Sequence, residues 1–92
     1  MPLKTEADLE RACSKLASFE GCKLWKWSSP GLAGVPDRLL FKPHGELIIV
    51  EFKTPKGTGI LSAMQERRIA ELRELGFRVE VIDNIEEFKA LL

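Results

Sequence analysis

The segment DRLLFKPHGELIIVEFK, residues 37–53, is the most informative part of this 92-residue chain about its fold. Two apolar runs flank a cluster at 43–45, whose proline and glycine favour a tight turn between strands. We therefore predict an antiparallel hairpin built from strands at 37–42 and 47–53. The residues at 47–50 are all apolar, which is typical of a central strand covered on both faces.

Helices and further strands are predicted on both sides of this hairpin. Thr5, with Asp8 three residues later, forms a capping-box variant that starts a helix near Glu6. That helix carries an apolar stripe of Leu9, Ala12, Cys13, Leu16 and Phe19. The order α-β-β-β-α-β-α predicts one domain over residues 1–92, an α/β fold in which helices flank a small mixed β-sheet. Its elements are a helix ended by Gly21, a strand at 22–27, a Gly/Pro loop at 28–36, the hairpin, a loop at 54–59, a helix from the Ser62 cap to 75, a strand at 77–82 and a helix from 84 to 92.

Composition excludes several classes of protein. The chain has 14 Lys and Arg against 14 Asp and Glu, so its formal net charge is zero and it is not a simple basic clamp on nucleic acid. Hydrophobic residues at 45% and charged residues at 30% are ordinary globular values, which excludes disorder. No apolar run is long enough to span a bilayer, and the N-terminus lacks a secretory pattern. We expect a cytoplasmic protein, without membrane partners, whose Cys13 and Cys22 are free, buried thiols.

The register of the hairpin predicts a metal site. Cross-strand partners have numbers with a constant sum, and a hairpin centred on His44 places Asp37 roughly opposite Glu51. Two opposed carboxylates repel one another unless a cation lies between them. Oxygen ligands on rigid strands suit Mg²⁺ or Mn²⁺. Taken alone, Asp37 could be a turn residue, and Glu51 with Lys53 could be an exposed ion pair at a strand end.

At this point the sequence resembles a known family. Pro36-Asp37, followed by Glu51-Phe52-Lys53, resembles the PD-(D/E)XK motif of metal-dependent nucleases. The blocks GVPDR at 34–38, EFKTPKG at 51–57 and QERR at 65–68 resemble more narrowly its VRR-NUC (virus-type replication-repair nuclease) branch, in the stand-alone form of phages and bacteria. The resemblance implies a restriction-endonuclease-like core and covers nearly the whole chain.

The resemblance also implies roles for individual residues. Asp37 and Glu51, helped by the main-chain carbonyl of Phe52, would bind Mg²⁺ or Mn²⁺. Lys53 would orient or activate the attacking water and stabilise charge on the phosphate. Glu10 matches the acidic residue of the family's first helix and would serve a second ion, and Gln65 matches a glutamine near the metal.

Other interpretations of these residues stay open. Glu6 could take the place of Glu10, and Gln65 could simply complete a capping box with Ser62. Trp25 and Trp27 share a strand face and suit core packing or a dimer surface better than base stacking. Candidate contacts to DNA are Ser29, Arg38, Lys56, Arg67 and Arg68, although the last two also suit ion pairs with Glu71 on a helix surface.

The function implied is a metal-dependent DNA endonuclease that hydrolyses phosphodiester bonds. The resemblance to minimal family members implies a homodimer acting on four-way (Holliday) junctions, in the cytoplasm of a bacterium or a phage-infected cell. One alternative is a non-catalytic nucleic-acid-binding or protein-binding module on the nuclease fold. Another is a nuclease for flaps or single strands.

Overall fold

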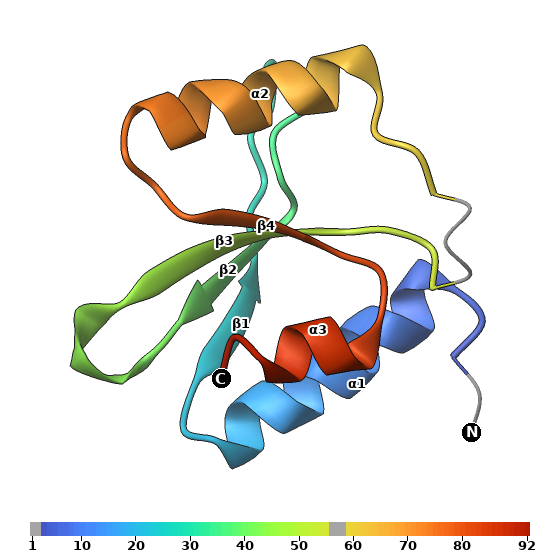
Figure 1. Cartoon of the computed structure of the whole chain (residues 1–92), viewed down its shortest axis with the longest axis vertical. Coiled ribbons are helices and arrows are strands. Elements are labelled where there is room, and N and C mark those ends of the chain that lie inside the picture. Colours follow the sequence, from blue (N-terminus) through green and yellow to red (C-terminus); the bar gives the residue numbers. More distant parts are fainter. Residues whose placement is uncertain (1–2, 56–58) are drawn as a thin grey trace.

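A computed structural model describes residues 3–55 and 59–92, and its helices lie on both sides of one β-sheet. In Figure 1 the sheet runs across the middle, with α2 on one face and α1 and α3 on the other. The predicted order of helices and strands is confirmed, with a short 3-10 turn, η1, inside the hairpin. The elements are α1 (Glu6–Phe19), β1 (Lys23–Lys26), β2 (Arg38–Phe41), η1 (Pro43–Gly45), β3 (Leu47–Phe52), α2 (Ala63–Glu74), β4 (Val79–Ile82) and α3 (Ile85–Lys89).

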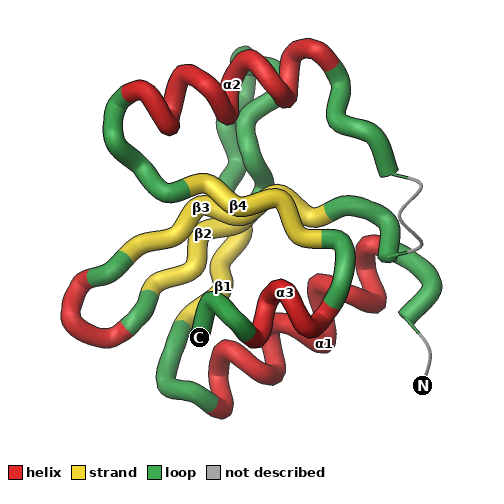
Figure 2. Tube along the Cα trace, viewed as in Figure 1, coloured by secondary structure: helices red, strands yellow, loops and turns green. Residues whose placement is uncertain are grey.

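The sheet has the strand order β1-β2-β3-β4 and is mixed. β2 and β3 pair antiparallel with Arg38 opposite Val50, whereas β3 and β4 pair parallel with Glu51 opposite Val81. Figure 2 shows the short helical turn that joins β2 to β3. At its centre His44 has a φ of 68°, a left-handed conformation that suits the tight turn predicted there. β3 is therefore a central strand, as its continuous apolar run predicted.

The helix starts follow the predicted caps. Thr5 and Asp8 form a reciprocal capping box at α1, and Ser62 and Gln65 form one at α2. Asn84 caps α3, where its side chain accepts a hydrogen bond from the Glu87 N–H.

Some predicted boundaries are wrong. α3 ends at Lys89 and not at residue 92, because Leu91 turns into the core through a tighter hydrogen bond from its N–H to the Phe88 carbonyl. β4 begins two residues later than predicted, because the Phe77 N–H donates its hydrogen bond to the Leu72 carbonyl at the end of α2. Phe19, expected in the apolar stripe, is 88% exposed because it lies in the last turn of α1, and Ala17 is buried in that helix instead.

The two faces of the sheet carry two apolar clusters. The larger packs β2 and β3 against α1 and α3 and includes Leu9, Leu40, Val50, Phe52 and Phe88, with the Phe52 and Phe88 rings 6.1 Å apart. Cys13 and Cys22 are buried there as free thiols, as predicted, and burial raises the pKa of Cys13 to about 12. The smaller cluster, of Ile49, Ile69 and Val79, lies under α2.

Trp25 and Trp27 differ in environment although both belong to the α2 side of the sheet. Trp27 packs against the smaller cluster, which confirms core packing for this residue. Trp25 is 59% exposed on the edge strand β1, where its ring is tilted by 56° against that of Phe41 with the ring centroids 5.2 Å apart. Core packing is therefore wrong for Trp25, whose side chain lies at the surface, and a dimer surface there stays a prediction.

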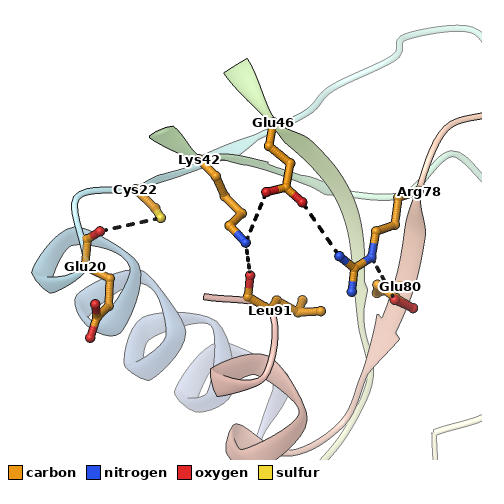
Figure 3. A network of polar contacts seen from close by, with 7 residues as sticks. All are labelled: Glu20, Cys22, Lys42, Glu46, Arg78, Glu80 and Leu91. Atoms are coloured by element: carbon orange, nitrogen blue, oxygen red, sulfur yellow. Dashed lines mark hydrogen bonds and ion pairs between the residues drawn. The ribbon is translucent and has the colours of Figure 1, made fainter. Parts of the chain in front are cut away.

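Polar contacts tie the end of the chain to the far end of the hairpin (Figure 3). Lys42 donates a hydrogen bond to the Leu91 carbonyl and lies 3.3 Å from Glu46. Glu46 also pairs with Arg78, which contacts Glu80 at 3.4 Å. This network holds the turn end of the hairpin, away from the end that carries Asp37 and Glu51. Across the described ranges, 3–55 and 59–92, none of the helices has the length and the apolar character that a membrane span requires.

Candidate functional site

Asp37 and Glu51 lie across from each other at the open end of the hairpin. Arg38 pairs with Val50, so the next pair outward in the same register is Asp37 with Glu51, as predicted. The Trp27 N–H donates a hydrogen bond to the Asp37 carbonyl at 2.9 Å, which fixes the backbone before β2. The sheet thus holds both carboxylates on rigid backbone.

Glu51 is a charged residue that is buried in the fold, with only 5% of its surface exposed. Burial, together with the neighbouring Asp37 carboxylate and against the opposing effect of Lys53, raises the pKa of Glu51 to about 7. A carboxylate in such a place is costly unless a cation compensates it. Perturbed acids of this kind cluster at functional sites.

The Asp37 side chain also fits a cation. Its Oδ1 atom is buried and has no hydrogen-bond partner, which is rare for a carboxylate oxygen. Within residues 3–55 and 59–92, no three His, Cys, Asp or Glu side chains form a ready-made metal cage. A divalent ion here would therefore be held by two carboxylates and completed by main-chain and water oxygens, a donor set that suits Mg²⁺ or Mn²⁺.

Lys53 follows directly after β3 and reaches toward α2. Its Nζ atom donates a hydrogen bond to Gln65 Oε1 at 2.9 Å. The same Oε1 accepts from the Ser62 N–H at 2.9 Å, while Ser62 Oγ accepts from the Gln65 N–H at 3.1 Å. The capping box of Gln65 with Ser62 is therefore confirmed, and the same oxygen atom also contacts Lys53, while the place of Gln65 near a metal ion stays a prediction.

Glu10 reaches the acidic pair from α1. Its Oε2 accepts a hydrogen bond from Arg38 Nη2 at 2.6 Å, and both side chains are about four-fifths buried. Arg38 Nη1 donates to the Asp37 carbonyl at 2.9 Å. Burial raises the pKa of Glu10, Arg38 opposes that rise, and Asp37 adds to it. Glu6 lies near enough to raise the pKa of both Glu51 and Glu10.

The candidate DNA-contacting residues are more scattered. Arg68 donates to Glu71 Oε1 at 2.7 Å and to the Ala33 carbonyl at 3.1 Å, and Arg67 lies 3.8 Å from Glu71. The predicted ion pairs with Glu71 are thus confirmed. Ser29 is half-buried in the loop before β2, and Lys56 lies outside the described residues. Contacts of any of these residues with DNA stay predictions.

Sequence reasoning missed three features of this site. It did not connect Arg38 to Glu10, which are 28 positions apart. It also missed two close backbone approaches made possible by glycine. A Cβ atom on Gly34, at a φ of 83°, would come 2.7 Å from Met64, and one on Gly59 would come 3.0 Å from the Lys53 Cβ. The glycines in the GVPDR and TPKGTG stretches were the available signal.

The fold and site define an α/β domain of the PD-(D/E)XK nuclease type, in which a hairpin presents two acids and a lysine beside a helix. The VRR-NUC domain family matches residues 4–84, and the chain belongs to this family. A solved VRR-NUC domain structure superposes with a TM-score of 0.83 at 26% identity, covering 94% of this chain and 91% of that one.

A phage protein is also similar in sequence. The protein named "Putative nuclease p44", from Acyrthosiphon pisum secondary endosymbiont phage 1, is 43% identical over 60 residues. The match covers 65% of this chain, and the chain spans 62% of the length of that relative.

Proposed function

We propose that this chain is a metal-dependent DNA endonuclease. The observation that carries the proposal is the convergence of Asp37, buried Glu51 and Lys53 at one end of the hairpin in a chain of the VRR-NUC family. Asp37, Glu51 and the Phe52 carbonyl would hold Mg²⁺ or Mn²⁺. Such an ion, when bound, lowers the pKa of water and neutralises charge that grows on a scissile phosphate.

The protein's own residues would then position the reactants. Lys53, held by Gln65, presents an ammonium beside the acidic pair, where it can orient a water molecule and attract a phosphate oxygen. Gln65 acts through Lys53, because its amide oxygen fixes where Nζ lies. The rigid strand places Glu51 two residues before Lys53, so both project to the same side.

Cleavage of a labelled four-way junction with Mn²⁺ tests this proposal. We expect cutting by the purified chain, none with excess EDTA, and a loss of at least about 100-fold in rate for Lys53→Ala. Lys15→Ala, which removes an exposed lysine from α1, is the matched control and should cut at the normal rate. Undiminished cleavage with EDTA, or by Lys53→Ala, would contradict the proposal.

We further propose that the substrate is a four-way junction and that the active form is a homodimer. Two symmetric cuts need two sites related by a two-fold axis. A panel of junction, flap, duplex and single-stranded DNA with Mg²⁺ or Mn²⁺ distinguishes the substrates, and preference for flaps or single strands would overturn the junction assignment. Binding without cutting under every divalent ion would indicate a non-catalytic module.

Sedimentation at micromolar concentration tests the homodimer directly. We expect twice the 10.4 kDa mass of one chain. A monomer would contradict junction resolution by a symmetric dimer while leaving nuclease activity intact.

A further inference from the structure

We propose that Arg38 neutralises Glu10 through a stable ion pair, so that the site takes one divalent ion, held by Asp37 and Glu51. This inference rests on the proposed function and deepens it, because it assigns the number of ions at the same site. It also gives Arg38 a positioning role inside the site in place of a contact with DNA.

The contacts of Arg38 carry this inference. Its Nη2 atom donates to Glu10 Oε2 at 2.6 Å, and its Nη1 atom donates to the Asp37 carbonyl at 2.9 Å and lies 4.0 Å from Asp37 Oδ2. Only 18% of the Arg38 side chain and 20% of the Glu10 side chain are exposed. A short, charge-assisted hydrogen bond in such a sheltered place occupies the Glu10 carboxylate. Breaking that bond to give Glu10 to a metal ion would leave a sheltered arginine without its partner.

The unused oxygen atoms point to the same conclusion. Asp37 Oδ1 is buried and lacks a hydrogen-bond partner, whereas Glu10 Oε2 already has a strong one. The carboxylates that still need a compensating cation are therefore Asp37 and buried Glu51, and not Glu10. Glu10 is thus held by a short ion pair, whereas Asp37 makes only a 4.0 Å contact with the same guanidinium and keeps one buried oxygen without a partner.

Charge counting agrees with one ion. The four neighbouring acids, Glu6, Glu10, Asp37 and Glu51, contribute four negative charges when ionised, and Arg38 and Lys53 contribute two positive charges. One divalent ion would take this group from −2 to 0, and a second ion would take it to +2. Removing Arg38 lowers the net charge of the group by one and leaves Glu10 free, so that a second ion can bind.

Mn²⁺ titration of the DNA-free chain tests the inference, with bound ions counted by calorimetry and by the electron paramagnetic resonance signal of free Mn²⁺. We expect one ion per wild-type chain. We expect Arg38→Gln to bind a second ion and to hold the first about tenfold more tightly, because a nearby positive charge is gone. Arg38→Lys restores the charge and should bind one ion.

Two controls keep the test sharp. Arg11→Gln removes the same charge from α1 at an exposed ion pair with Asp8, and it should bind one ion with wild-type affinity. The double variant Glu10→Gln with Arg38→Gln removes the pair at constant net charge. It should also bind one ion with an affinity within about threefold of wild type, because Glu10 is not a ligand.

Three outcomes would overturn the inference. These are two Mn²⁺ ions on the wild-type chain, one ion with unchanged affinity on Arg38→Gln, or a loss of more than about tenfold in affinity in the double variant. If Arg38→Gln does not fold, the wild-type count and the double variant still decide. Because no DNA is present, the result is independent of whether the chain cuts DNA.

Discussion

At the scale of single residues, Glu51 shows a conflict between stability and chemistry. A glutamine of the same shape would bury more easily than a carboxylate whose pKa is raised to about 7 by burial and by Asp37. The folded chain holds the Glu51 proton more tightly than an unfolded chain, where the ordinary pKa is 4.5. The Glu51 contribution to stability is therefore lost as the pH rises from about 4.5 to about 7.

We expect Glu51→Gln to stabilise the metal-free chain above pH 7. The gain in unfolding free energy should be on the order of 1–3 kcal/mol at pH 8 and should vanish near pH 4.5. Urea unfolding in EDTA at the two pH values measures it. Glu74→Gln, an exposed change at the end of α2, should shift stability by less than about 0.5 kcal/mol at either pH. A gain that does not depend on pH would show that titration of Glu51 is not its cause.

At the scale of elements, the start of α2 links helix formation to the site. Gln65 Oε1 accepts from the Ser62 N–H and from Lys53 Nζ, so the cap that begins the helix also positions the lysine after β3. Gly34 lets the loop before β2 approach Met64 in the same first turn of α2. The helix start, the loop and the strand end therefore meet around one amide side chain.

Two variants separate the capping of α2 from the positioning of Lys53. Ser62→Ala removes the acceptor for the Gln65 N–H and should cost about 0.5–2 kcal/mol of stability, with cleavage by the folded protein little changed. Gln65→Ala removes the Lys53 contact as well and should lower the cleavage rate at least about tenfold at saturating DNA. The cleavage rates of the two variants are compared well below each variant's melting temperature, so that both proteins are folded. Equal rates for the two variants would contradict the positioning role of Gln65.

At the scale of the whole molecule, zero net charge conceals a strongly acidic site. The chain balances 14 acids with 14 bases overall, yet Glu6, Glu10, Asp37 and Glu51 lie near one another at one end of the sheet. Mutual repulsion there weakens the metal-free fold, and a divalent ion relieves it. Binding to the folded chain alone should therefore raise the melting temperature.

We expect Mn²⁺ at 100 times its dissociation constant to stabilise the chain by about 2.7 kcal/mol, or about 10–20 °C in melting temperature. Because a Glu51 with a pKa of about 7 must lose its proton to bind metal, affinity should fall about tenfold between pH 8 and pH 6. Thermal melts at fixed Mn²⁺ concentration measure both effects. A shift of equal size at pH 6 and pH 8, or in Glu51→Gln, would contradict the assignment.

Much of this molecule could be predicted from local sequence. The turn residues and apolar run at 37–53 specify the hairpin, and its register follows from simple counting, so Asp37 opposite Glu51 was predictable. The caps at Thr5 and Ser62 act over three residues, which is why both helix starts were predicted correctly. Errors fell at element ends, where the Phe77 N–H bonds back to the Leu72 carbonyl of α2 and Leu91 turns into the core.

The order of elements, the family and the pair of opposed acids follow from spacing along one chain and could therefore be predicted. Three other features depend on how the chain packs in space: Arg38 engages Glu10, Gln65 contacts Lys53 while it caps α2, and Glu51 is buried. The partners in the first two contacts are 28 and 12 positions apart and belong to different elements. Their distances depend on how the helices pack on the sheet, and that packing is set by the apolar core and not by the polar residues that meet beside it.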